Sequence, residues 1–209
     1  MGVILEMSAR KLFIIDFDGT VADSYRLSIE CIAQYKKTKI DDLEGLRGSP
    51  TIDVIRKFDL SIIDLLRMIF FVRREFYRRI EEIKPSPGIL DAMRSIKSSG
   101  AVIQLISSNS RRNIEKFFTL HGAKDLLGEI EVCYTIFGKS RNLSRMVRSS
   151  GIDKNNIFYV GDETRDIEAA KKVGIRSISV PWGYNNRSIL VQYGPDRMLT
   201  KASDLLGLV

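Results

Sequence analysis

The fold of this chain is decided by Leu12-Phe13-Ile14-Ile15-Asp16-Phe17-Asp18-Gly19-Thr20, an apolar run that ends in two carboxylates and a turn. The apolar run predicts a buried strand. Asp16 and Asp18 would form a small negative pocket where the strand ends, which suits Mg²⁺ because this cation takes oxygen ligands. A carboxylate clamped by a metal can also act as a covalent nucleophile. Gly19 and Thr20 turn the backbone away and supply amide and hydroxyl donors, although such residues are also common in ordinary turns.

The composition limits the class of protein. A chain of 209 residues is long enough for one large core, or for one core with a small inserted domain. No apolar stretch approaches the roughly 18 residues of a membrane-spanning helix. The segment 1–10 is too short and too polar for a secretory signal. Cys31 and Cys133 form no metal-spaced motif and are expected to be free thiols in a reducing compartment, so we expect a cytoplasmic protein without a membrane partner.

The charge indicates the kind of partner. A formal net charge of +7 suits anionic partners, either phosphorylated metabolites or nucleic acid. The lysines and arginines are scattered and lack the interleaved aromatic residues of a single-strand binder, so nucleic acid is not expected. His121, which precedes Gly122 near the end of a helix pattern, is interpreted as structural. The oligomeric state is left open.

Strand and helix patterns alternate along most of the chain. The strand 11–16 is followed by helical patterns over 24–83, which end at the break Pro85-Ser86-Pro87-Gly88. Within them an apolar stripe at helical spacing predicts core positions for Ile62, Leu66, Ile69, Phe76, Ile80 and Ile83. Beyond the break the patterns predict strands at 101–107, 130–135, 157–161 and 176–180, and helices at 89–98, 111–121, 140–150, 164–173, 186–192 and 201–207.

This alternation predicts an α/β fold, in which a parallel sheet carries helices on both faces. The helical region after the first strand does not fit the sheet, so we expect an inserted all-helical unit. We place the core at 1–21 and 85–209 and the insertion at 22–84. Because ligands of such sheets bind beyond the carboxyl ends of the strands, residues at those ends are the candidates for a functional site.

Two of these candidates could hold an anion. Ser107, Ser108 and Asn109 end the strand 101–107, where hydroxyl groups and helix-start amides can hold phosphate oxygens. The same residue types also serve as ordinary helix caps. Lys139 follows Phe137-Gly138 at a helix start, where its charge opposes the helix dipole. A nearby anion would account for it.

A third candidate is acidic. Gly161-Asp162-Glu163-Thr164-Arg165-Asp166 follows the strand 157–161. Asp162 and Asp166 are four residues apart at a helix start, which can bring both onto one face. Although Asp162 could be a plain helix cap, three acids within five positions also resemble the second half of a metal site. Glu163 could be a ligand, a partner of Lys139 or Arg165, or a surface residue.

Together these residues resemble the haloacid dehalogenase superfamily of aspartate-based phosphatases. The resemblance covers nearly the whole chain in four ordered parts: Asp-x-Asp-Gly-Thr at 16–20, Ser107, Lys139 and Gly-Asp-x-x-x-Asp at 161–166. It implies a Rossmann-like core, and the insertion is similar to the small helical cap of the phosphoglycolate phosphatase-like subgroup. Asp18 favours phosphate esters, since dehalogenases and phosphonate-cleaving relatives typically lack a carboxylate there.

The resemblance also implies roles for individual residues. Asp16 would be the nucleophile and Asp18 the general acid and base. Mg²⁺ would be held by Asp16, the main-chain carbonyl of Asp18 and Asp162, while Asp166 would act through water or Lys139. The phosphoryl group would be bound by Gly19, Thr20, Ser107, Ser108, Asn109 and Lys139.

The substrate remains open at this point. Arg47, in the turn Gly45-Leu46-Arg47-Gly48-Ser49-Pro50, could meet a carboxylate or a second anionic group of a small phosphorylated metabolite. The resemblance makes phosphoglycolate a reasonable candidate. One alternative is a phosphohexomutase of the β-phosphoglucomutase type. Another is a non-catalytic, basic nucleic-acid-binding or scaffold protein on the same fold.

Overall fold

The predicted first strand lies at the centre of the fold as β1 (Leu12–Asp16). The structure, a computed structural model, describes residues 10–209 except 41, 58 and 134–137. Its main sheet has six strands in the order β5-β4-β1-β6-β7-β8, and every pairing among these described strands is parallel. The other strands are β4 (Val102–Ser107), β5 (Ile130–Val132), β6 (Ile157–Gly161), β7 (Arg176–Ser179) and β8 (Arg197–Met198).

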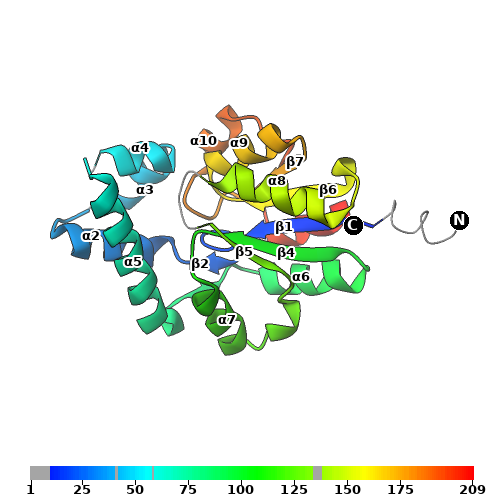
Figure 1. The fold of residues 1–209 in the computed structure, drawn as a ribbon, viewed down its shortest axis with the longest axis horizontal. Coiled ribbons are helices and arrows are strands. Elements are labelled where there is room, and N and C mark those ends of the chain that lie inside the picture. The colour runs from blue at the N-terminus through cyan, green and yellow to red at the C-terminus, as the bar shows by residue number, and fades with distance from the viewer. Residues whose placement is uncertain (1–9, 41, 58, 134–137) are drawn as a thin grey trace, which may run out of the picture.

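Helices cover both faces of this sheet (Figure 1). One face carries α6 (Ile89–Ser98) and α7 (Arg111–Leu120), and the other carries α8 (Lys139–Ser150) and α9 (Thr164–Val173). Successive residues of a strand point to opposite faces, so Phe13 and Ile15 pack on the first layer while Leu12 and Ile14 pack on the second. This explains the unbroken apolar run of β1, and the predicted α/β class is confirmed.

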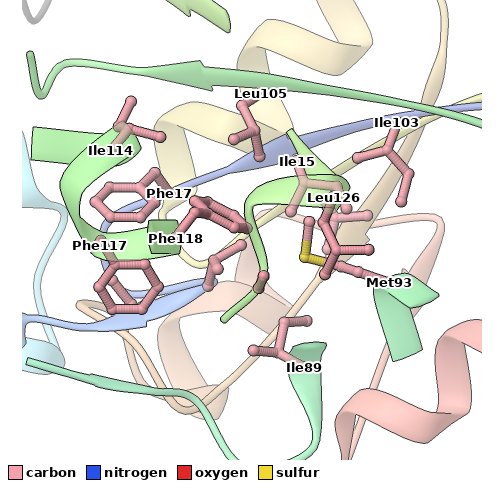
Figure 2. Close-up of a cluster of buried hydrophobic side chains, with 14 of the residues drawn as sticks. Ile15, Phe17, Ile89, Met93, Ile103, Leu105, Ile114, Phe117, Phe118 and Leu126 are labelled. Carbon is pink, nitrogen blue, oxygen red and sulfur yellow. The ribbon is translucent and has the colours of Figure 1, made fainter. Parts of the chain in front are cut away.

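Phe17 anchors the turn that follows β1. Its ring lies edge-on to Phe117, with the centroids 5.1 Å apart, and Phe117 in turn lies edge-on to Phe118 at 5.7 Å. Figure 2 shows these rings of α7 beside Ile114, in the same core as Met93 of α6. Because Phe17 is fully buried between Asp16 and Asp18, packing of the core fixes the backbone that carries both carboxylates.

The helical insertion separates β1 from the rest of the sheet. It contains α2 (Tyr25–Lys36), α3 (Leu43–Arg47), α4 (Thr51–Arg56), α5 (Ile62–Arg78) and the 3₁₀ turn η1 (Ile80–Glu82). Figure 1 shows α2 to α5 grouped beside the layers of the sheet. Two short strands that were not predicted, β2 (Ala22–Asp23) and β3 (Lys84–Pro85), pair antiparallel and join the two ends of the insertion.

The predicted core stripe of the insertion is only half right. Phe76, Ile80 and Ile83 are buried, but Ile62 is 78% exposed and Leu66 is 50% exposed. The first half of α5 extends away from the sheet, so its face with Ile62 and Leu66 does not pack on the described core. Met68, on another face of the same helix, is buried.

The remaining elements complete the core. They are α10 (Arg187–Gln192) and the 3₁₀ helices η2 (Lys124–Leu126), η3 (Lys154–Asn156) and η4 (Ala202–Leu208). Strand β8 was not predicted, and the helix expected at 201–207 is the 3₁₀ helix η4. The strand expected at 130–135 covers 130–132, and its last two positions lie outside the described residues. Within the described part of the chain, no helix is both long and apolar enough to cross a membrane.

Phe117→Ala is expected to destabilise the protein by about 3–5 kcal/mol, because it leaves a cavity where Phe17 and Phe118 meet. Leu120→Ala on the same helix is the control: Leu120 is 46% exposed, and its truncation should cost less than about 1 kcal/mol. Urea unfolding followed by circular dichroism measures both. Equal losses for the two variants would contradict the anchoring role of this aromatic cluster.

Candidate active site

The predicted site residues converge at one edge of the sheet. Asp16 ends β1, Ser107 ends β4 and Gly161 ends β6, and these three strands are neighbours. The loop 180–185 follows β7 at the same edge, where it contacts the turn after β1. Parallel strands bring their carboxyl ends together, so residues far apart in the sequence meet here.

A buried ammonium group lies at the centre of the site. Lys139 Nζ is 2.6 Å from Asp16 Oδ2 and 2.6 Å from Asp166 Oδ1. Asp166 also accepts hydrogen bonds from the Tyr159 hydroxyl at 2.9 Å and from the Glu163 N–H at 3.0 Å. Lys139 is the first residue of α8, where its charge opposes the helix dipole, and the two carboxylates supply the anion that this position requires.

The pKa values follow from burial and from these contacts. Burial alone would lower the pKa of Lys139, but Asp16 and Asp166 outweigh it and the pKa is raised, so the group stays charged. Burial would raise the pKa of Asp166, but Lys139 and Arg165 hold it below its usual value. For Asp16, burial dominates over Lys139, and the neighbouring carboxylates help to raise its pKa to about 7.

Asp18 lies in a different environment from Asp16. Its carboxylate accepts hydrogen bonds from Ser24 Oγ at 3.2 Å, Ser107 Oγ at 3.2 Å and Asn109 Nδ2 at 3.1 Å. Burial raises the pKa of Asp18 despite these donors. Two carboxylates that are two residues apart thus have different partners: Asp16 pairs with the Lys139 ammonium, whereas Asp18 accepts hydrogen bonds from the neutral side chains of Ser24, Ser107 and Asn109.

Asp162 is bound by the turn after β1 and by the loop after β7. Its Oδ1 accepts from Thr20 Oγ1 at 2.6 Å, and its Oδ2 accepts from the Tyr184 N–H at 2.6 Å. Gly19 has a φ of +77°, and a Cβ there would collide with the Asp162 carboxylate. The glycine is therefore required both by the backbone conformation and by the close approach of Asp162.

One group of acids among the described residues could hold a metal ion. Ligand atoms of Asp16, Glu163 and Asp166 all lie within 4.8 Å of one another. Glu163 is buried and forms an ion pair with Arg165, so the surface interpretation of Glu163 is wrong. Asp162, which was expected to be a ligand, is adjacent in sequence but does not belong to this group.

The charge of the site fits a divalent cation. Asp16, Asp18, Asp162, Glu163 and Asp166 bring five carboxyl groups together, and the described basic groups that neutralise them are Lys139 and Arg165. Burial raises the pKa of Asp162 well above its usual value, and the neighbouring carboxylate of Glu163 adds to the shift. Hard oxygen donors of this kind suit a hard divalent cation.

The predicted phosphate-binding residues surround the same carboxylates. Ser107 and Asn109 donate to Asp18, Thr20 donates to Asp162, and Lys139 donates to Asp16 and Asp166. The Gly19 N–H donates to the Ala22 carbonyl at 2.8 Å. Ser108 lines the cavity described below.

The contacts of Arg47 differ from those that its predicted role, binding an anionic group of the substrate, requires. Its Nε donates to the Gly183 carbonyl at 2.9 Å and its Nη2 to the Pro181 carbonyl at 3.0 Å. In return the Asn186 N–H donates to the Arg47 carbonyl at 2.9 Å, and Asn185 Nδ2 donates to the Ser49 carbonyl at 2.8 Å. We call these four contacts the Arg47 clasp. The guanidinium is used to hold the insertion against the core, so this geometry gives no support to a role in reading a second anionic group.

A cavity of about 160 Å³ lies between the core and the insertion. Asp16, Asp18 and Asn109 belong to the side of the cavity formed by the core, which we call the lower wall. The insertion supplies the upper wall, where all lining residues except Tyr25, Ser28, Thr51 and Arg73 are aliphatic, methionine or phenylalanine. The cavity therefore joins the acidic site to an apolar surface.

Some site residues were not found from the sequence. Tyr184 donates its N–H to Asp162, and its hydroxyl contacts that of Ser28 in the insertion. Ser24 donates to Asp18, and Arg73 donates to the Ser108 carbonyl at 2.8 Å. A signal existed for Tyr184 alone, because Pro181-Trp182-Gly183-Tyr184 directly follows a predicted strand end.

The family of the chain follows from comparison with known proteins. Residues 13–180 match the haloacid dehalogenase-like hydrolase family. This range contains the converging acids and the lysine between them. The chain belongs to the haloacid dehalogenase-like hydrolases.

Its relatives are named as phosphatases. The chain is 34% identical over 203 residues to the phosphoglycolate phosphatase of Synechococcus elongatus, covering 94% of this chain and 95% of that protein. It is 20% identical over 206 residues to a pyrophosphatase of Halalkalibacterium halodurans, again covering 94% and 95%. These relatives place the chain among the phosphatases of the family.

Solved structures agree with the fold. A haloacid dehalogenase-like hydrolase from Streptococcus pneumoniae has a TM-score of 0.76 at 18% identity, covering 95% of this chain and 97% of that one. A predicted phosphoglycolate phosphatase from Haemophilus somnus has a TM-score of 0.74 at 19% identity, covering 97% and 99%. The expected Rossmann-like core with a helical insertion is thereby confirmed.

Arg47→Ala should loosen the insertion from the core, because it removes the two hydrogen bonds to the carbonyls of Pro181 and Gly183. The amide of Asn186 should then exchange with deuterium about five- to thirty-fold faster, since each of the two hydrogen bonds contributes about 1 kcal/mol. Arg56→Ala is the matched control, because Arg56 pairs with Asp53 on its own helix. Unchanged exchange at Asn186 in Arg47→Ala would show that the clasp does not hold the two parts together.

Proposed function

We propose that the protein is a Mg²⁺-dependent phosphatase that hydrolyses a small phosphate monoester through an aspartyl phosphate on Asp16. One observation carries this proposal. The buried Lys139 ammonium lies between Asp16 and Asp166. Asp16 ends β1, and Asp18 follows it by two residues. A phosphate dianion approaching a carboxylate needs such a positive charge beside it, because like charges would otherwise repel strongly.

In the first step a carboxylate oxygen of Asp16 attacks phosphorus, and the bond from phosphorus to the alcohol oxygen breaks. The leaving oxygen takes the proton carried by Asp18, whose pKa is raised by desolvation in the site. Lys139, held between two carboxylates, would offset the charge on the phosphoryl oxygens. Ser107 and Asn109 would turn from Asp18 towards the same oxygens.

In the second step Asp18 takes a proton from water, and the water oxygen attacks phosphorus. The bond between Asp16 and phosphorus breaks, inorganic phosphate leaves and Asp18 holds a proton again. One residue thus serves as the acid of the first step and the base of the second. Asp16 is buried and Asp18 half-buried at the base of the cavity, which would limit access of water before the alcohol departs.

Mg²⁺ would lie among the convergent acids. Asp16 and Asp162 and the main-chain carbonyl of Asp18 are the ligands that the family resemblance implies, and the position of Glu163 makes it a further candidate. The ion would supply positive charge for the phosphoryl oxygens. Asp166 instead holds Lys139 in place.

The core and the insertion have different roles in the proposed reaction. In this proposal the described residues of 1–21 and 85–209 act as the catalytic core, and those of 22–84 act as a cap over the site. The Arg47 clasp joins the cap to the core, and the paired strands β2 and β3, where the cap leaves and rejoins the core, would be its hinge. Closure would exclude bulk water from the reacting groups.

Phosphoglycolate is one candidate substrate, on the strength of the relative from Synechococcus elongatus. A mutase of the β-phosphoglucomutase type remains the alternative enzyme, since it would use the same pair of aspartates. Incubation with β-glucose 1-phosphate distinguishes the two activities: a phosphatase releases inorganic phosphate, and a mutase yields glucose 6-phosphate. A nucleic-acid-binding scaffold would show salt-dependent binding to DNA or RNA without turnover.

Asp16→Asn should lower Mg²⁺-dependent hydrolysis by at least about a thousand-fold, because it removes the nucleophile with almost no change in volume. The assay is phosphate release from a panel of phosphate monoesters, with Mg²⁺ and with EDTA. Asp91→Asn is the control, since Asp91 pairs with Arg94 on the surface of α6. Retention of more than about a hundredth of the activity by Asp16→Asn would rule out the covalent role.

Asp18→Asn should discriminate between leaving groups. Hydrolysis of an alkyl phosphate is expected to fall by about a thousand-fold, because its poor leaving oxygen needs the proton. Hydrolysis of p-nitrophenyl phosphate should fall much less, since nitrophenolate leaves without protonation. The ratio of the two kcat/KM values is the measurement. Equal losses on both substrates would remove Asp18 from the role of general acid.

A further inference from the structure

The two walls of the cavity differ in chemistry. The core side offers Asp16, Asp18 and Asn109, which face the reacting phosphoryl group in the proposed reaction. The insertion offers Ile29, Ile32, Val54, Leu65, Met68 and Phe76 to the same space. Apart from Tyr25, Ser28, Thr51 and Arg73, the insertion therefore offers aliphatic, methionine and phenylalanine side chains to whatever is attached to the phosphoryl group.

Basic groups in the cavity wall are already used by the protein. Arg73 donates through Nε to the Ser108 carbonyl at 2.8 Å and through Nη2 to the Cys133 carbonyl at 3.4 Å. Arg165 is neutralised by its ion pair with Glu163. Arg47, the expected partner of a substrate carboxylate, is not among the residues that line the cavity. Arg73 keeps its charge, but a second negative charge on the substrate would have to compete with two main-chain carbonyls for its N–H groups. Against the rest of the insertion's lining such a charge would meet mostly apolar surface, which is costly.

The volume sets the size of the occupant. An apolar cavity of ~150 Å³ is known to accept benzene, and this cavity measures about 160 Å³. Because the phosphoryl group beside Asp16 and Asp18 takes part of this volume, the remaining space suits an alcohol part somewhat smaller than benzene, of about four or five carbons. Such a group would displace water from the apolar wall.

We propose that the cavity selects phosphate monoesters whose alcohol part is uncharged and apolar, of the size of a short alkyl chain or one ring. This proposal rests on the proposed phosphatase function. It separates the chain from enzymes that read a carboxylate or a second phosphate beside the reacting phosphoryl group. Selectivity comes from burial of the alcohol's carbon atoms against the apolar side chains of the upper wall.

The test is a series of n-alkyl phosphates from ethyl to octyl, with phosphoglycolate as the charged probe. The leaving alcohols differ little in acidity, so differences in kcat/KM report contacts with the alkyl chain. We expect kcat/KM to rise about four-fold for each added methylene until the cavity is full at about four or five carbons. Phosphoglycolate should be used at least about a hundred-fold less well than butyl phosphate.

Val54→Thr should reduce the gain for each methylene, because it places a hydroxyl in the upper wall at nearly constant shape. Val191→Thr is the matched control, since Val191 is 54% exposed on α10 and should leave the series unchanged. Binding of n-butylphosphonate against methylphosphonate, measured by calorimetry on the wild-type protein, makes the same comparison without turnover.

The outcomes separate the two proposals. A flat series, or a preference for phosphoglycolate, would overturn the apolar selectivity and leave the phosphatase function standing. Absence of Mg²⁺-dependent hydrolysis across the whole panel would overturn the phosphatase function, and this inference with it. A rising series that is blunted in Val54→Thr alone would support both.

Discussion

The whole site depends on the burial of Lys139 between Asp16 and Asp166. Removing three charged groups from water is costly, and their mutual attraction offsets that cost only if the geometry is held tightly. That geometry requires β1, α8 and α9 to keep their relative positions. Packing on both faces of β1 therefore serves the chemistry as much as the stability, because movement of any one element would leave a buried charge without its partner.

Chemistry and selectivity come from different parts of the chain. The acids and the lysine lie at strand ends and helix starts of the sheet, where the backbone is fixed by core packing. The groups that would contact the rest of the substrate lie on the helices of the insertion. The Arg47 clasp connects the two parts through main-chain carbonyls, so the contact depends little on which side chains the loop 181–183 carries.

The sequence was most informative where a pattern repeats. The period of the apolar residues predicted α6, β6 and α9 with their observed bounds, and the strand-end rule brought the acids of 16–18 and 161–166 together. The strands β2 and β3 have two residues each, too few to show a period. The exposed half of α5 has a helical stripe without a core to cover it. Partners of Arg47 are carbonyl groups, which every residue possesses, so no sequence signal marks them.

The pairing of β2 with β3 has a consequence for how such a protein can change. The insertion departs and returns at adjacent points, so its two ends lie side by side whatever helices come between them. A different helical unit, or a short linker, could be grafted between Asp23 and Lys84 without moving β1 or the start of α8, which carries Lys139. The binding wall is in this sense an exchangeable module, and new substrates can be acquired while the catalytic apparatus stays as it is.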